Sequence, residues 1–204
     1  MTNRDKAVAK HGFYRAVGKR ALDIILACVM LVILSLPMLI IALVIKLDSS
    51  GGVIFKQTRI GRGGEPFVCY KFRSMLADAP HDLPSAEFDA PEYITPVGRF
   101  LRRTSLDELP QIVNVIKGDM SFVGVRPLIP CEEALHKGRA LCGAYELRPG
   151  ITGLAQICGR DMISDAEKLG FDAEYAKNVG FALDVRIFFL TFSRVLRRED
   201  IRVK

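Results

Sequence analysis

Residues Ile24 to Ile45 read IILACVMLVILSLPMLIIALVI and contain no charged side chain. A continuous helix rises about 1.5 Å per residue, so a stretch of 22 residues could cross a hydrocarbon core of about 30 Å. A cleaved signal peptide has a shorter apolar region, of about 7–15 residues, that begins nearer the terminus. A buried core helix is also shorter, at about 10–14 apolar residues. The stretch therefore predicts a membrane anchor that stays attached to the chain.

The two flanks of this stretch carry equal numbers of cations. Six Lys and Arg residues lie within 1–20 and six within 46–73, whereas a spanning helix normally has more of them on its cytoplasmic side. Pro37, near the middle, removes a backbone donor, and the hydroxyl of Ser35 can bond a carbonyl that the break frees. The segment fits either a re-entrant hairpin of two short helices, which returns through the same leaflet, or a kinked transmembrane helix.

The remaining chain predicts one mainly helical domain with a small amount of sheet. Of the 204 residues, half are apolar and a quarter are charged, which excludes a disordered chain. Residues 53–75 have two apolar runs around a glycine-rich turn at 61–64, the pattern of a β-hairpin. Residues 78–96, rich in proline and acidic side chains, predict a surface loop. Helices are expected near 97–103, 107–117, 132–142, 164–178 and 183–198, with irregular stretches at 118–131 and 148–160.

Charge and cysteine content narrow the class of protein. A net charge of +6 suggests an anionic partner, which could be nucleic acid, an acidic membrane surface or a phosphorylated substrate. Residues 1–20 are basic with interleaved apolar side chains, which suits either an interfacial helix or a solvated arm. The five cysteines are dispersed and form neither a disulfide framework nor a zinc pattern. Cys158 has no nearby histidine to activate it, so a packing role is expected.

The stretch from Arg99 to Gln111, RFLRRTSLDELPQ, places three arginines before an adjacent carboxylate pair, Asp107 and Glu108. One interpretation is a capping box with Ser105 as the N-cap and Glu108 three positions later. Pro110 disfavours that register, because its missing N–H would fall within the hydrogen-bonded turns. With Asp107 as the N-cap, Pro110 loses no bond, and the carboxylate sits at a helix start that can also hold phosphate. The spacing leaves both a capping and a catalytic role open for Asp107.

These residues resemble those of the bacterial sugar transferases, the small monotopic phosphoglycosyl transferases that act on polyprenyl phosphate. The resemblance spans about residues 18–195 in the usual order of the motifs. It is carried by the apolar segment ending at Lys46, YKFRSM at 70–75, TSLDELPQIVN at 104–114, KGDMS at 117–121, VGVRP at 123–127, PGITG at 149–153, and by Gln156 and Gly159-Arg160. Where the family usually has Pro-Arg-Pro, this chain has Val125-Arg126-Pro127, and Leu36 separates Ser35 from Pro37.

The resemblance implies transfer of a sugar 1-phosphate from a UDP-sugar to polyprenyl (undecaprenyl) phosphate, with release of UMP and initiation of glycan assembly. It implies that Asp107 is the nucleophile that forms a covalent phosphosugar intermediate, and that Glu108 assists. Mg²⁺ is the implied cofactor, with Asp107 as a ligand, because phosphoryl transfer concentrates negative charge and Mg²⁺ keeps several waters. The expected substrate-binding residues are Arg102, Arg126, Lys71, Arg73, Gln156 and Arg160.

The expected architecture is an α+β protein in two parts. Residues 1–48 form an interfacial helix and a re-entrant membrane anchor broken near Pro37, and residues 49–204 form a cytoplasmic catalytic domain. The acceptor phosphate lies at the membrane surface, which favours the hairpin over a spanning helix, with the active site on the cytoplasmic face of a bacterial inner membrane. The expected partners are the UDP-sugar, polyprenyl phosphate and membrane lipids, with no nucleic acid and with homo-oligomerisation left open. An inactive, membrane-bound phosphate-binding scaffold is the alternative function.

Overall fold

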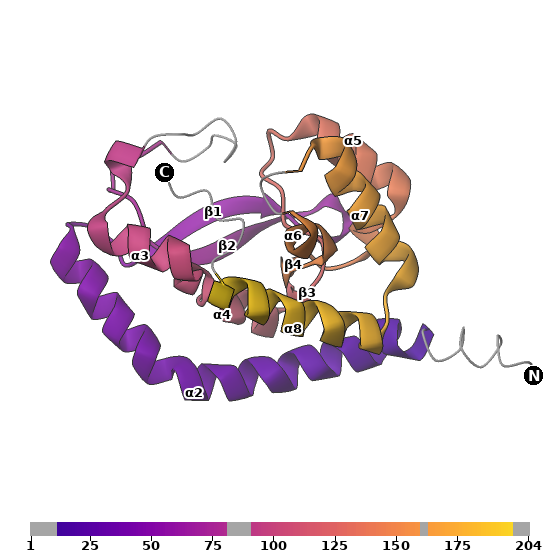
Figure 1. Cartoon of the computed structure of the whole chain (residues 1–204), viewed down its shortest axis with the longest axis horizontal. Helices are drawn as coiled ribbons and strands as arrows, with labels where there is room; N and C mark the ends of the chain where they lie inside the picture. The colour runs from indigo at the N-terminus through magenta and orange to yellow at the C-terminus, as the bar shows by residue number, and fades with distance from the viewer. Residues whose placement is uncertain (1–11, 81–90, 160–162, 198–204) are drawn as a thin grey trace, which may run out of the picture.

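The computed structural model describes residues 12–80, 91–159 and 163–197, which form helices around two small sheets (Figure 1). The α+β class predicted from the sequence is confirmed, with one long apolar helix near the N-terminus. The helices are α2 (Lys19–Asp48), α3 (Pro96–Thr104), α4 (Gln111–Lys117), α5 (Glu133–Cys142), α6 (Leu154–Cys158), α7 (Asp165–Asn178) and α8 (Phe181–Arg197). The strands are β1 (Ile54–Ile60), β2 (Pro66–Phe72), β3 (Ser121–Val123) and β4 (Gly150–Thr152).

The apolar segment forms one bent helix, not the two short helices expected. α2 runs without interruption over 30 residues with Pro37 inside it, and Figure 1 shows that it bends in its middle. Within a helix, Pro37 deprives only the carbonyl of Ile33 of its usual donor, so the remaining bonds can hold the two halves together. The Ser35 hydroxyl donates to the carbonyl of Val32 at 2.8 Å, one residue before the one freed by proline.

One face of α2 packs along the whole domain. Asp23, Ala27 and Ile45 are buried on this face. The N-terminal half joins the main core, which includes Ala27, whereas the C-terminal half packs with Ile45 against Phe72 and Leu101 in a second cluster. The opposite face is apolar and exposed; it includes Leu22, Ile25, Val29, Val32, Ile33, Leu36, Leu39, Ile40, Leu43 and Leu47. Such a continuous exposed apolar face is typical of contact with lipid or with another protein.

The predicted β-hairpin is present. β1 and β2 pair antiparallel over seven residues each, with Gln57 opposite Cys69 and Phe55 opposite Lys71. The turn contains Gly63 and Gly64 at φ values of 73° and 80°, which glycine adopts without steric cost. Because side chains alternate along a strand, Arg59, Cys69 and Lys71 share one face of the hairpin. That face turns toward the carboxylate pair.

A second, parallel pair of strands forms in the stretches that the sequence left irregular. β3 pairs with β4, and Gly124 and Gly150 allow the close approach, because an added Cβ at either would lie within 2.6 Å of a backbone atom. Asn114 of α4 is fully buried; its Oδ1 accepts from the Tyr70 amide at 3.0 Å, and its Nδ2 donates to the Val68 carbonyl at 2.6 Å. Asn114 thus fixes α4 against β2.

The other predicted helices appear within two residues of their expected bounds. The exception is 107–117, where a 3₁₀ turn at Leu106–Glu108 comes first and α4 begins only at Gln111. In the basic N-terminal arm, residues from Gly12 onward are helical and lead into α2. Residues 1–11 and the central part of the predicted loop at 78–96 lie outside the described residues.

A buried polar cluster ties the start of α2 to the C-terminal helices. The carboxylate of Asp184 in α8 accepts hydrogen bonds from Tyr14 (2.7 Å), Lys19 (2.6 Å) and Tyr175 (2.8 Å). Burial, together with Asp184, raises the pKa of Tyr175, so its hydroxyl stays protonated and remains a donor. Asp23 accepts from the amide of Phe122 at 3.1 Å. Residues more than 160 positions apart are therefore joined in one network.

Candidate active site

The carboxylate pair lies on a sharp connection between α3 and α4. Ser105 ends α3 in the left-handed region at φ 56°, which no other described non-glycine residue adopts. The 3₁₀ turn that follows presents Asp107 and Glu108, both half-buried. Such a backbone conformation is unfavourable for serine and is found where surrounding contacts impose a local geometry. The connection holds the two carboxylates beside β2.

Neither capping arrangement considered for this stretch forms. The N-cap of the 3₁₀ turn is Ser105 and the N-cap of α4 is Pro110, and neither side chain makes a capping hydrogen bond. Asp107 therefore does not begin α4, because the residues from Leu106 to Pro110 already have helical backbone angles that continue into it. The N-terminus of α4 therefore lies after Asp107, and the amides of Glu108 and Leu109 donate to the carbonyls of Ser105 and Leu106.

Glu108 of the 3₁₀ turn forms an ion pair with Lys71 of β2. The Lys71 ammonium donates to the Glu108 carboxylate at 2.7 Å, and both side chains are mostly shielded from water. Lys71 lies on the face of β2 opposite that of the buried Phe72, as the strand's alternation requires. The structure thus brings Glu108 and the predicted substrate-binding Lys71 together.

Arg126 lies on a turn that is fixed through its backbone carbonyl. The carbonyl of Arg126 accepts from Arg139 Nη1 of α5 at 2.6 Å. Arg139 is itself fixed by Asp172 of α7 through two contacts, at 2.8 Å from Nε and 2.7 Å from Nη2. Both members of this pair are buried, so the turn that carries Arg126 rests on a rigid support.

Arg59 is a site residue that sequence reasoning missed. Its guanidinium donates to Gln57 Oε1 at 2.6 and 3.0 Å and to the carbonyl of Pro127 at 3.0 Å, next to Arg126. Burial, and secondarily the charge of Arg126, lower the pKa of Arg59 to about 10, which still leaves it protonated at neutral pH. The alternation of β1 and β2 could have revealed it, because it places Arg59 on the face of Lys71.

A small polar cavity lies where these side chains meet. Its lining includes three cations and one carboxylate, namely Arg59, Lys71, Arg126 and Glu108, together with Gln156. Cations that converge in a partly buried space repel one another, and a bound anion relieves that repulsion. Arginine forks match phosphate oxygens in pairs. The cavity itself measures only about 10 Å³, enough for a water-sized group, so a phosphate attracted by these cations would bind at its opening rather than inside it.

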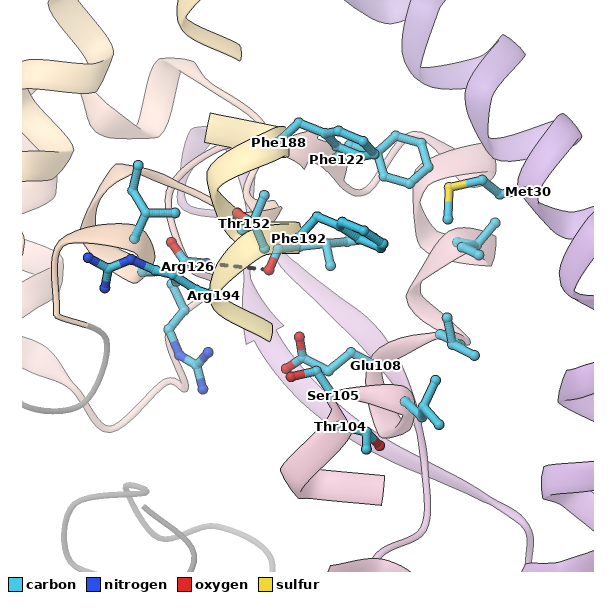
Figure 2. Close-up of a pocket in the computed structure, with 17 residues that line it drawn as sticks. Met30, Thr104, Ser105, Glu108, Phe122, Arg126, Thr152, Phe188, Phe192 and Arg194 are labelled. Carbon is cyan, nitrogen blue, oxygen red and sulfur yellow. Dashed lines mark hydrogen bonds between the residues drawn. The ribbon is translucent and has the colours of Figure 1, made fainter. Parts of the chain in front are cut away.

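A larger cavity of about 270 Å³ adjoins the first (Figure 2). Glu108, Arg126, Ile151 and Gln156 line both. At one end Met30 of α2 lies near Phe122 and Phe188, and toward the other end lie Ser105 and Glu108. Nine of the seventeen lining side chains are apolar. The site therefore combines a charged part with an apolar part that extends to the anchor helix.

Gln156 of α6 lies between the two cavities. Its Nε2 donates to the carbonyl of Ile151 at 3.4 Å, whereas its Oε1 is buried and has no hydrogen-bond partner. A buried acceptor without a donor is unfavourable until a ligand supplies one. The predicted substrate-binding role of Gln156 is consistent with this geometry.

The structure does not bring every predicted residue to the cavities. Arg73 is buried and donates to the backbone carbonyls of Ser49 and Ser50, so it secures the end of α2. Arg102, half-buried in the last turn of α3, lines neither cavity, and neither does Asp107. Arg160 lies outside the described residues. Burial raises the pKa of the Cys158 thiol, which disfavours the nucleophilic thiolate.

The side chains fit a magnesium ion that keeps most of its coordination from water and substrate. Among the described residues, no group of three or more His, Cys, Asp or Glu side chains converges into a protein cage. Asp107 and Glu108 are consecutive on the 3₁₀ turn, and carboxylate oxygens are ligands that Mg²⁺ uses together with water and substrate phosphates. This donor set is compatible with the predicted cofactor.

Comparisons with known proteins identify the class. The bacterial sugar transferase family matches residues 14–198. The chain is 44% identical over 182 residues to the UDP-glucose:undecaprenyl-phosphate glucose-1-phosphate transferase of Escherichia coli, covering 85% of this chain and 39% of that protein. It is 40% identical over 198 residues to the undecaprenyl-phosphate galactose phosphotransferase of Salmonella typhimurium, covering 89% of this chain and 41% of that protein.

A third relative matches over most of its own length. The exopolysaccharide production protein ExoY of Rhizobium meliloti is 37% identical over 204 residues, which cover 90% of this chain and 89% of that protein. Together, the family match and these relatives show the class of protein to which the chain belongs. The chain belongs to the bacterial sugar transferase family, as its motifs predicted.

Proposed function

We propose that the chain transfers a sugar 1-phosphate from a UDP-sugar to polyprenyl phosphate. The observation that carries the proposal is the cluster of Arg59, Lys71 and Arg126 around Glu108, in a chain whose relatives are named as sugar phosphate transferases acting on undecaprenyl phosphate. The product, a polyprenyl diphosphate sugar, is the starting point for assembly of a glycan. The name of the Rhizobium relative favours an exopolysaccharide as that glycan.

The reaction proceeds in two displacements. The Asp107 carboxylate attacks the β-phosphorus of the UDP-sugar, and the bond from that phosphorus to the bridging oxygen breaks, so UMP leaves with the oxygen. An oxygen of the polyprenyl phosphate then attacks the same phosphorus and releases the Asp107 carboxylate. A carboxylate is a competent covalent phosphoryl acceptor, and the intermediate divides a transfer between two anions into two steps.

The other site residues bind and orient the charged groups. Arg59, Lys71 and Arg126, which line the small cavity, supply positive charge for the diphosphate, and the adjoining larger cavity has the volume to hold it. Glu108 holds Lys71 in place through their ion pair at 2.7 Å. The buried Oε1 of Gln156 accepts a hydrogen bond from a hydroxyl of the UDP-sugar. Arg102, one helical turn before the carboxylate pair, binds a substrate phosphate from outside the described cavities. Asp107, with Glu108 beside it, would hold Mg²⁺, which when bound neutralises charge on the transferring phosphoryl oxygens.

The anchor lies in one leaflet of the membrane as a re-entrant helix. α2, with the turn before it, is long and apolar enough to cross a membrane over Tyr14–Asp48. However, its two halves pack against the same domain, through Ala27 near one end and Ile45 near the other. A spanning orientation would carry part of that domain into hydrocarbon, where exposed charges such as Arg99 and Arg103 are strongly unfavourable. A bend at Pro37 lets both ends return to the cytoplasmic face.

This topology predicts that both ends of the anchor are accessible from one side. In a variant without the five native cysteines, single cysteines at Thr2 and Lys46 should both resist a membrane-impermeant maleimide in intact cells. Both should react in inside-out vesicles, and a variant that keeps only the exposed Cys131 serves as the control for the catalytic domain. Labelling of the two sites from opposite sides would show that α2 spans the membrane.

The enzymatic function predicts UMP release that depends on both substrates. The purified protein in detergent micelles, given Mg²⁺, undecaprenyl phosphate and each of a panel of UDP-sugars, should release UMP and form labelled lipid with at least one sugar. The alternative, an inactive phosphate-binding scaffold, predicts UDP-sugar binding without UMP or labelled lipid. An absence of both products across the panel would contradict the enzyme and favour the scaffold.

A further inference from the structure

The larger cavity has a chemical character that the donor substrate does not explain. Met30, Phe122 and Phe188 line one end, Glu108 lies toward the other end, and Phe192 and Arg126 lie between them. A UDP-sugar is rich in hydroxyl, amide and phosphate groups, and such groups lose hydrogen bonds when they enter an apolar space. The apolar end therefore suits a ligand segment that makes no hydrogen bonds.

We propose that this cavity binds the head-proximal isoprene units of the acceptor, with Arg194 of α8 binding the acceptor phosphate. The proposal rests on the proposed function, and it adds the place at which the lipid sits. Arg194 and Arg126 line the same cavity, and both lie on one side of it in Figure 2. A phosphate bound between them would lie next to Glu108, at the junction with the small polar cavity.

The walls of the cavity connect it to the apolar surface of the anchor. Met30 lines the cavity from α2, and its helix neighbours Val29 and Ile33 belong to the exposed apolar face of α2. On the other wall, Phe192 of α8 lines the cavity although it is 63% exposed, so it lies at the rim. An isoprenoid chain can pass between these walls from the hydrocarbon region without crossing a polar surface.

The volume and the composition agree with this occupant. The cavity measures about 270 Å³, whereas a single water molecule requires only about 10–15 Å³ in such a measure. Water in the apolar end would lack the two to four polar partners that hold a buried water, so a bound hydrocarbon segment gains by displacing it. The Thr191 hydroxyl donates to the carbonyl of Ile187 at 2.8 Å and accepts from Thr152 at 2.6 Å, so the hydrogens of both hydroxyls are used within the wall.

The test compares two phenylalanines of the same helix. Phe192 and Phe189 are similarly exposed, at 63% and 66%, but only Phe192 lines the cavity. A contribution from general membrane contact would therefore be similar for the two side chains. With saturating UDP-sugar in detergent micelles, Phe192→Ala should raise the KM for undecaprenyl phosphate about tenfold, the effect of about 1.4 kcal/mol. Phe189→Ala should leave that KM unchanged, and Phe192→Leu should restore most of the affinity.

Two further measurements locate the effect. Farnesyl phosphate, which keeps only the head-proximal units, should show the same rise in KM with Phe192→Ala. Arg194→Gln should also raise the KM for the lipid about tenfold, whereas Arg186→Gln, an exposed residue of α8 outside the cavity, should not. The KM for the UDP-sugar should be unchanged in each variant.

Three outcomes overturn the inference. A rise in the KM for the UDP-sugar alone would assign the cavity to the donor. Equal effects of Phe189→Ala and Phe192→Ala would mean general membrane contact. A normal lipid KM in Phe192→Ala, in an enzyme that still makes lipid product, would refute the acceptor site and leave the proposed function standing. Failure of the wild-type protein to release UMP or form lipid product would instead refute the proposed function.

Discussion

Asp107→Asn is expected to lower the rate of UMP release at least a thousandfold, roughly 4 kcal/mol of lost transition-state stabilisation. The amide has the size and shape of the carboxylate but is a poor nucleophile, so neither displacement can begin. Intact-mass spectra of the wild-type protein with UDP-sugar and no acceptor should show a mass increase equal to the sugar phosphate less one water, because UMP leaves. The variant should show none. Wild-type turnover in Asp107→Asn would mean that another residue is the nucleophile.

Glu108→Gln is the informative control for this experiment. Glu108, not Asp107, lines both cavities and pairs with Lys71. If Asp107 is the nucleophile, Glu108→Gln should still form the mass adduct, but more slowly, because Lys71 loses its ionic partner. If the adduct survives in Asp107→Asn and disappears in Glu108→Gln, the roles of the two carboxylates are exchanged. The two variants share the same 3₁₀ turn, so a general loss of structure would affect both.

Asp184→Ala is expected to lower the free energy of unfolding by about 3–5 kcal/mol, the usual effect of leaving a buried charge without its partner. The substitution removes the acceptor of Lys19, Tyr14 and Tyr175, and the ion-paired side chains of Lys19 and Asp184 are only 14% and 7% exposed. Denaturant unfolding in micelles, followed by circular dichroism, measures the loss.

The matched control is the pair between Lys137 and Glu133, whose side chains are 80% and 81% exposed. Glu133→Ala should change the free energy of unfolding by less than about 0.5 kcal/mol, because exposed helix pairs contribute little. Asp184→Asn keeps one of the two acceptor oxygens that Tyr14 and Tyr175 use, and its loss of stability should lie between those of Asp184→Ala and Glu133→Ala. Equal stability of Asp184→Ala and the wild-type protein would show that the buried network does not hold α2 to the domain.

The sequence predicted those features that depend on local pattern. The apolar run, the alternation of 53–75 and the glycine turn were enough to place α2 and the hairpin. The cluster of Lys71, Glu108, Arg126 and Gln156 was also anticipated, through the family motifs rather than through spacing. The sequence did not predict that α2 is continuous across Pro37. This continuity depends on the packing of both halves of the helix against one domain, which a local pattern does not encode.

Features that depend on distant contacts escaped prediction. Arg73 belongs to the same motif as Lys71, yet its side chain binds the carbonyls of Ser49 and Ser50, and only the position of the end of α2 decides this. Arg59 joins the site because the hairpin pairs in one particular register. The support of Arg126 by Arg139 and Asp172 joins three separate segments, a relation that no local pattern encodes.

The pairing of the first helix with the last has a consequence for biosynthesis. Lys19 and Tyr14 leave the ribosome early, whereas their partner Asp184 is made more than 160 residues later. During translation α2 therefore lacks its native contacts with α8. A bilayer is the environment that best accommodates its apolar side chains in that interval. The contacts that join Tyr14 and Lys19 to Asp184 can therefore form only after the final helix has been synthesised.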